Sequence, residues 1–110
     1  MNLTLTGRHL EVTPYLKAHV DEKAKKLDHF NSHIIKTEIV LLKEGAKDVA
    51  EAKIHLSHAV LTAKGEGKDM YIAVNDVVDK LVAQLHRQQG KFHDRKRPGH
   101  RDEGREAGGI

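Results

Sequence analysis

The stretch VAEAKIHLS, residues 49–57, alternates apolar and polar side chains along its length. After Val49, four apolar residues fall on one side and four polar residues on the other: Ala50, Ala52, Ile54 and Leu56 against Glu51, Lys53, His55 and Ser57. A period of two is typical of a β-strand with one face on a core and the other facing water. The stretch therefore predicts a sheet that is covered on one side only.

Three further strands are expected around this one. Residues 2–6 alternate in the same way and end at Gly7, and residues 34–42 are rich in β-branched side chains. Residues 60–64 follow a tight connection near His58. The short connections between the last three strands predict antiparallel hairpins.

Two helices complete the expected fold. Thr13 can cap a helix that begins at Pro14, because proline at the first helical position gives up no needed donor. Apolar residues at helical spacing extend this helix over about residues 14–28, and a longer one is expected over about residues 70–92.

The predicted fold is α+β with the order β-α-β-β-β-α. The first crossover predicts that strands one and two are parallel or neighbours in one four-stranded sheet. Both helices are expected on its apolar face, while the other face is polar and open to water. Residues 1–96 are expected to form one domain, and residues 97–110, rich in Pro, Gly, Arg and Glu, a disordered polar tail.

Composition narrows the class of protein. With 110 residues, 38% hydrophobic and 32% charged, the chain resembles one soluble globular domain. No apolar run is long enough to span a bilayer, and the N-terminus lacks the apolar segment of a signal peptide. The absence of cysteine excludes disulfides, thiolate zinc sites and cysteine nucleophiles. A cytoplasmic location is expected.

The net charge of +3 is unevenly distributed. Residues 80–97 hold six basic residues and one acid, so the rest of the chain is slightly acidic. One strongly basic element is typical of a protein that binds a polyanion. A run of charges is also the usual composition of a solvated helix face.

The basic residues of the second helix recur at steps of seven, four and four: Lys80, Arg87, Lys91 and Arg95. At about 100° per residue they fall within an arc of roughly 80°, about 115° from the centre of the apolar stripe. They are therefore expected beside the first helix, with Lys26 facing them across a groove and Lys23 reaching out at the edge of its own apolar face. Such a groove would suit folded RNA, but composition and spacing alone do not choose between RNA binding and a solvated face.

The segment AKGEGKDMY, residues 63–71, places two glycines and a lysine before the second helix. A phosphate-binding P-loop needs four residues between its first glycine and Gly-Lys-Ser/Thr, whereas Gly65 and Gly67 are one residue apart. Asp69 would repel a phosphate but suits a helix N-cap. A tight turn and a helix cap are therefore favoured over a nucleotide site.

Other chemistries find little support. The nine histidines form no tight cluster with carboxylates, so neither a metal site nor a cofactor is expected. No nucleophile is paired with a base, so no enzyme is expected. Tyr71 is interpreted as a packing residue rather than a stacking platform. The alternative function is a protein-interaction module that regulates a sigma factor.

Two longer segments carry a family resemblance. GRHLEVTPYLKAHVDEKAKKLDHF, residues 7–30, and GEGKDMYIAVNDVVDKLVAQL, residues 65–85, are similar to the ribosome hibernation-promoting factor family. This family also contains the ribosome-associated inhibitor and proteins labelled as sigma-54 modulation proteins. The most specific motif is DMY followed by an apolar-patterned DKL. The resemblance covers about residues 1–95 and points to the short form, which lacks a C-terminal dimerisation domain.

The resemblance implies a fold akin to double-stranded-RNA-binding domains. It implies binding to the rRNA of the small ribosomal subunit in the decoding channel, where the protein would block mRNA and tRNA and inhibit translation in stationary phase. It further implies that the protein promotes inactive ribosome dimers with ribosome modulation factor. Neither a membrane nor a small-molecule substrate is expected, and the protein is expected to be a monomer off the ribosome.

The resemblance also implies a set of RNA-binding residues. By position, the basic residues of the family correspond to Lys23, Lys26, Lys80, Arg87 and Lys91, and Arg95 continues their arc. Ala83 and Gln89 stand where relatives often carry a basic residue, and Asn75-Asp76 replaces the more usual Asp-Gly. These departures lower the local positive charge, which the run from Arg95 to Arg97 would offset.

Overall fold

The computed structural model describes residues 2–94 and, within them, the side chains of residues 2–30 and 33–88. Its elements are β1 (Leu3–Gly7), α1 (Pro14–Ala24), the 3₁₀ helix η1 (Lys25–His33), β2 (Ile34–Glu44), β3 (Lys47–Leu56), β4 (Val60–Gly67) and α2 (Met70–Asp94). The predicted order β-α-β-β-β-α is confirmed. The predicted polar tail, residues 97–110, lies outside the described residues.

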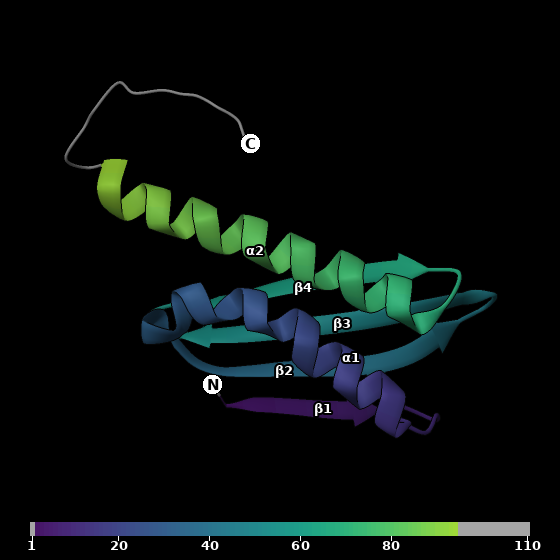
Figure 1. The fold of residues 1–110 in the computed structure, drawn as a ribbon. Helices are drawn as coiled ribbons and strands as arrows, with labels where there is room; N and C mark the ends of the chain where they lie inside the picture. The colour runs from purple at the N-terminus through teal and green to yellow at the C-terminus, as the bar shows by residue number, and fades with distance from the viewer. Residues whose placement is uncertain (1, 95–110) are drawn as a thin grey trace.

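The four strands form a sheet in the order β1-β2-β3-β4 (Figure 1). β1 runs parallel to β2, as the crossover predicts, and β2–β3 and β3–β4 are antiparallel hairpins. Gly45 lies in the turn between β2 and β3 with a φ of +62°, a left-handed conformation that glycine adopts without steric cost.

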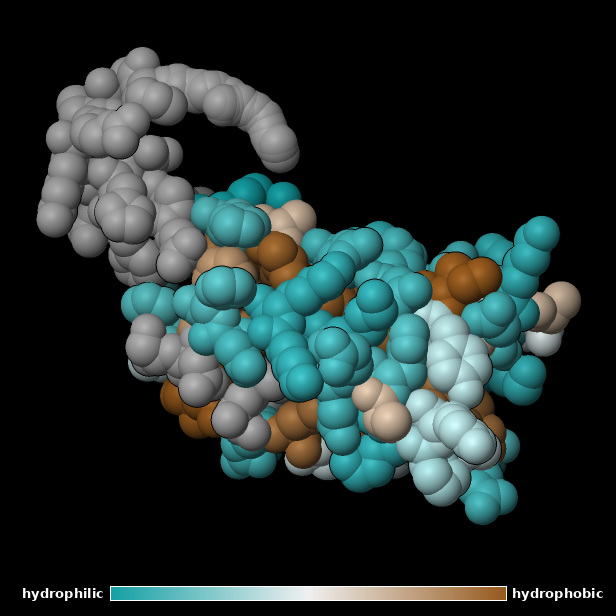
Figure 2. Space-filling view, in the orientation of Figure 1, coloured by the Kyte–Doolittle hydropathy of each residue, from teal (hydrophilic) through white to brown (hydrophobic). Residues whose placement is uncertain are grey.

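Both helices pack against one face of this sheet (Figure 1). The register aligns facing residues in rows across all four strands, for example Leu5, Ile39, Ala52 and Ala63. Apolar side chains of the helices cover these rows: Leu16, Val20, Leu27, Phe30, Val74, Val77, Val78 and Leu81. The surface over the helices is largely hydrophilic in the view of Figure 2. The apolar face that the sequence predicts is therefore buried beneath α1, η1 and α2.

The first helix ends earlier as an α-helix than the sequence predicts. Its N-cap is as expected, since Leu16 N donates to Thr13 Oγ1 at 3.1 Å. From Lys25 on, however, the chain continues as the 3₁₀ helix η1. Buried apolar residues recur here at steps of three, at Ala24, Leu27 and Phe30. Three residues per turn keep all of them on one line toward the core, which explains the tighter helix.

The predicted glycine turn is wrong in its extent, because Gly65 and Gly67 belong to strand β4. A Cβ atom on Gly65 would collide with Ala73 O and Val77 N, so α2 rests directly on the strand at this point. Asp69 caps α2 as predicted, with Ile72 N donating to Asp69 Oδ1 at 2.9 Å. The glycine serves close packing between helix and strand.

Candidate RNA-binding surface

The seam between α1–η1 and α2 is the first part of the candidate surface. Three contacts define it: His19 Nε2 to Asn75 Oδ1 at 2.8 Å, Lys26 Nζ to Asp79 Oδ1 at 3.2 Å, and the edge-on rings of Phe30 and His86 with centroids 5.2 Å apart. The sequence predicts that Lys26 faces α2, and its ion pair confirms this. The residues of α2 along the seam are polar or acidic rather than basic.

The opposite flank of α2 lies against β4, the edge strand of the sheet. We call its side chains Asp76, Lys80 and Gln84 the edge flank. Lys80 Nζ donates to Lys64 O at 2.8 Å, and Gln84 Nε2 donates to Thr62 O at 2.7 Å. Asp76 Oδ2 accepts from the backbone N–H of Glu66 at 3.1 Å. The edge flank therefore satisfies backbone groups that an edge strand otherwise leaves unpaired.

Asp76 is the anchor of the edge flank. The hydrogen bond from the Glu66 backbone N–H holds the pKa of Asp76 below its usual value of 3.8. Lys80 Nζ, 3.2 Å from Asp76 Oδ2, lowers this pKa further, and partial burial opposes both effects. The carboxylate thus stays ionised and holds Lys80 beside β4.

The predicted position of Lys80 in a groove between the helices is wrong. Its ammonium group reaches β4, on the side of α2 away from α1. Arg87 follows Lys80 by about two helical turns, so it lies on this same side. Helical spacing gives the angle between the cations and the apolar stripe, but it does not say which neighbouring element stands on that side. The sheet order places β4 there.

Two of the predicted RNA-binding lysines have carboxylate partners, and these two lie on different flanks of α2. Lys26 pairs with Asp79 across the seam, and Lys80 pairs with Asp76 on the edge flank. Both lysine side chains are 51% exposed. The Lys26–Asp79 pair joins two exposed side chains and contributes only about 0–1 kcal/mol, so a phosphate group can replace Asp79 with little loss of stability. Asp76 is also bonded to the backbone of β4, so a phosphate would contact Lys80 alongside this carboxylate rather than replace it.

The other predicted RNA-binding residues differ from these two. Within the described part of the chain, Lys23 and Arg87 form no ion pair. Arg87 is exposed and Lys23 is half-buried. The guanidinium group of Arg87 and the ammonium group of Lys23 can therefore each contact an external anion. The side chain of Lys91 and the whole of Arg95 lie outside the described residues.

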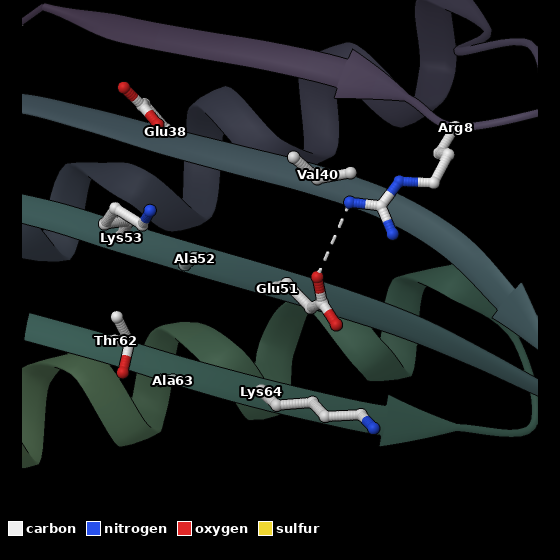
Figure 3. Close-up of a pocket in the computed structure, with 9 residues that line it drawn as sticks. All are labelled: Arg8, Glu38, Val40, Glu51, Ala52, Lys53, Thr62, Ala63 and Lys64. Carbon is white, nitrogen blue, oxygen red and sulfur yellow. Dashed lines mark ion pairs between the residues drawn. The ribbon is translucent and has the colours of Figure 1, made fainter.

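The open face of the sheet carries charges that compensate one another. A shallow hollow of about 560 Å³ lies on this face. Figure 3 draws the residues that line it, with the helices behind the sheet. A guanidinium nitrogen of Arg8 lies 3.8 Å from Glu51 Oε1 across it, the ion pair that Figure 3 marks with a dashed line. Lys53 stands on the same face. The hollow is on the opposite side of the sheet from the seam.

Further ion pairs extend this pattern over the open face. A hydrogen bond from Lys36, 3.0 Å away, lowers the pKa of Glu38. The carboxylate of Glu44, 3.0 Å from Lys64 Nζ, raises the pKa of Lys64. Arg8, Lys36 and Lys64 each have a carboxylate partner. Lys53 forms no ion pair with another described side chain, but its charge helps to lower the pKa of Glu38. This face therefore attracts a polyanion less than the surface around Lys23 and Arg87.

Other kinds of site find no support in the described residues. Among the side chains of residues 2–30 and 33–88, no group of three or more histidine, aspartate or glutamate residues is arranged to hold a metal ion. None of the helices in this range has the length and apolar character needed to cross a bilayer.

Comparisons with known proteins define the class to which this fold belongs. The solved structure of a ribosomal subunit interface protein from Coxiella burnetii has the same fold, with a TM-score of 0.77 at 23% identity over 82% of this chain and 99% of that one. The crystal structure of the Thermus thermophilus Protein Y N-terminal domain matches with a TM-score of 0.72 at 31% identity, covering 80% of this chain and 99% of that one.

Sequence comparison identifies the family. The ribosome hibernation promoting factor of Klebsiella oxytoca is 36% identical over 92 residues, which are 84% of this chain and 97% of that protein. The family model described as "Sigma 54 modulation protein / S30EA ribosomal protein" matches residues 3–93. The chain belongs to this family. The resemblance drawn from the sequence motifs is thereby confirmed, while the likeness to double-stranded-RNA-binding domains stays a prediction.

Sequence reasoning missed the contacts that orient the candidate surface. It assigned no role to Gln84 or to the pairing of His19 with Asn75, and it noted Asp76 as part of a departure from the family motif but predicted no contact for it. Asp76, Lys80 and Gln84 recur at steps of four, which indicates a common polar stripe. That signal was available in the sequence, but the identity of the partner strand was not.

Proposed function

We propose that this chain is a ribosome hibernation factor that binds rRNA of the small ribosomal subunit in the decoding channel. There it blocks mRNA and tRNA and inhibits translation without catalysing a reaction. The observation that carries this proposal is the 36% identity to a ribosome hibernation promoting factor over 97% of that protein's length. We further propose that the bound form promotes inactive ribosome dimers, with ribosome modulation factor as a partner.

The charges on the helical side of the molecule support RNA as the ligand. Lys23 and Arg87 form no ion pair within the described residues, so each can contact a phosphate directly. Lys26 can exchange the exposed carboxylate of Asp79 for a phosphate oxygen, and the half-exposed side chain of Lys80 can donate to a phosphate while it stays beside Asp76. Phosphate contacts of this kind supply affinity, and the shape of the RNA channel supplies placement.

Occlusion is the mechanism that these features support. Rigid helices packed on a sheet hold the cations in place before binding, so little conformational entropy is lost when RNA is engaged. A protein held by phosphate contacts where mRNA and tRNA lie excludes both by volume. No bond needs to be made or broken for translation to stop.

Co-sedimentation with purified small and large ribosomal subunits over a series of salt concentrations tests the proposal. We expect the protein to bind the small subunit and not the large one. Small subunits that already carry mRNA and tRNA should not bind it. With about five phosphate contacts, log affinity should fall with log salt at a slope between about −4 and −5. Equal binding to both subunits, or binding that ignores salt, would contradict the proposal. A salt-tolerant complex with a sigma factor would favour the alternative of a sigma-factor regulator.

A further inference from the structure

The first turns of α1 and α2 each carry an exposed tyrosine. Tyr15 is the second residue of α1 and its surface is 82% exposed, and Tyr71 is the second residue of α2 and is 39% exposed. Both helices begin at the same end of the molecule (Figure 1). Among the large hydrophobic residues that are exposed, Tyr15 has the highest exposed fraction.

Side-chain contacts order these rings into a row across the seam. The rings of His19 and Tyr71 meet edge-on at 81°, with centroids 5.0 Å apart. Asn75 Oδ1 lies 2.8 Å from His19 Nε2 and fixes the plane of the imidazole. Tyr15 precedes His19 by four residues on α1, so the two side chains are neighbours on one helix face. Tyr71 thus packs as the sequence predicts, and part of its ring remains exposed.

Tyr15 contributes little to the fold. Its side chain makes no hydrogen bond or ring contact with any other described residue, and it is not part of the hydrophobic core. An aromatic ring left in water gives up the free energy that its burial would provide. A tyrosine ring has only two side-chain torsions to order, so it binds a flat partner with a small loss of entropy. These properties are those of a contact residue rather than of a structural one.

The surroundings of the row favour a nucleobase as its partner. Lys23 follows His19 by four residues and forms no ion pair within the described residues, and Lys26 lies further along the seam. Aromatic faces that continue into a row of cations are the usual arrangement for single-stranded nucleic acid, because bases stack while phosphates contact the cations. Among the described residues, the large apolar side chains exposed at this end are Tyr15, Tyr71 and Ile72. Three side chains are few beside the about 20–30 residues a side of a typical stable protein–protein interface.

We propose that Tyr15, supported by the Tyr71–His19 pair, is a stacking site for an unpaired base of RNA. The inference rests on the proposed function, since it concerns how the same protein engages rRNA. Phosphate contacts can form with any RNA. A stacking contact at Tyr15 would in addition select RNA that has an unpaired base. The RNA strand would enter the seam at the end where Tyr15 and Tyr71 lie and would continue toward Lys23.

Matched variants at one position test this site. We expect Tyr15→Ala to weaken binding to purified small subunits by about five- to a hundredfold, the effect of losing one base–aromatic stack. Tyr15→Phe keeps the ring and should bind within about twofold of the parent protein. The salt slope of Tyr15→Ala should equal that of the parent, because no phosphate contact is lost. Tyr15 is outside the core, so neither variant should change the unfolding transition.

The possible outcomes separate this inference from the proposed function. If the parent protein fails to bind small subunits, the proposed function fails. If the parent binds with the expected salt slope and Tyr15→Ala binds equally well, only the stacking site is overturned. Equal losses in Tyr15→Ala and Tyr15→Phe would assign the effect to the hydroxyl group and also overturn it.

A photocrosslink identifies the partner directly. A benzophenone side chain placed at position 15 should give adducts with small subunits that ribonuclease removes. Adducts with a ribosomal protein, which protease rather than ribonuclease removes, would overturn the stacking site in favour of a protein contact. The same photoreactive side chain at position 72, on the neighbouring exposed Ile72, provides the matched control for proximity without stacking.

Discussion

The two flanks of α2 differ in what they contact and in how they hold their charges. On the seam, Asn75 and Asp79 face α1 and η1, and the ion pair of Asp79 with Lys26 joins two exposed side chains. On the edge flank, Asp76 and Lys80 bond both to each other and to the backbone of β4. One flank is a surface between helices, and the other is part of the sheet's edge.

A cation on a helix can therefore both stabilise the fold and bind a ligand. Lys80 belongs to the set that the family resemblance assigns to RNA, yet it also satisfies the carbonyl oxygen of Lys64. Arg87, on the same side of the helix, has no ion pair with any other side chain that the structure describes, residues 2–30 and 33–88. Replacing Lys80 would therefore test stability and binding together, whereas replacing Arg87 tests binding alone.

The largest effect is expected where α2 rests on β4. Gly65→Ala should lower the free energy of unfolding by about 3 kcal/mol, because the new methyl group meets backbone atoms of α2, which can move only if the helix shifts. Urea denaturation followed by circular dichroism measures this. Gly67→Ala is the comparison: its Cβ would meet Cβ and Cγ2 of Ile72 and would lie 3.0 Å from Ala73 N, a less severe backbone contact than at Gly65, so a smaller loss of about 2 kcal/mol is expected. Equal losses in both variants would refute the close seating of the helix at Gly65.

The next effect concerns Arg87, which lies on the β4 side of α2 and forms no ion pair with another described side chain. Arg87→Glu should weaken binding to small subunits on the order of tenfold, since one phosphate contact is replaced by repulsion. Lys53→Glu makes the same charge change on the open sheet face and should leave binding within about twofold. Co-sedimentation of the two variants compares the two sides of the molecule. A larger loss of binding in Lys53→Glu than in Arg87→Glu would place the RNA on the open face of the sheet and contradict the proposal.

Much of the fold was predictable from the sequence, and the reasons are local. The alternation in residues 49–57, the Thr13 and Asp69 caps and the apolar stripe of α2 each follow from short-range chemistry. The extension of β4 to Gly67 was not predictable, because glycine in a strand is explained only by the helix that packs on it. The site was predictable in its residue types but not in its arrangement. Which side of α2 faces α1 depends on the strand order, which helical spacing does not contain.

A smaller effect is expected from the pH dependence of the edge flank. The pKa of Asp76 is lowered in the folded protein, so its contribution to stability is complete above the usual value of 3.8 and is lost as pH falls through the lowered pKa. The stability difference between the parent protein and Asp76→Asn should therefore shrink on acidification through this range. Unfolding free energies measured from neutral pH down to about pH 3 test this.

A second variant separates the two causes of the Asp76 shift. The hydrogen bond from Glu66 N is the larger cause and the charge of Lys80 the smaller. Lys80→Met should therefore keep most of the pH dependence. If it removes the dependence completely, the backbone hydrogen bond is not the main cause.

The smallest effect is expected on the seam. Asp79→Asn releases Lys26 from an exposed ion pair and should change the free energy of unfolding by less than about 0.5 kcal/mol. Removing one negative charge next to RNA should raise affinity for small subunits by about two- to threefold. Filter-binding titration measures the gain. As a control, Asp79→Asn should raise the affinity less when Lys26 is already replaced by Met. A loss of affinity in Asp79→Asn would show that Asp79 itself contacts the subunit.

The central claim is that the helical side of the molecule faces the phosphates of rRNA and the open sheet face does not. The salt dependence of small-subunit binding tests it most directly, measured for the parent protein, Arg87→Gln and Lys53→Gln. The slope of log affinity against log salt should become shallower by about 0.9 for Arg87→Gln, the value for one lost phosphate contact, and should stay unchanged for Lys53→Gln. The same slope for all three proteins, or a change with Lys53→Gln alone, would contradict the claim.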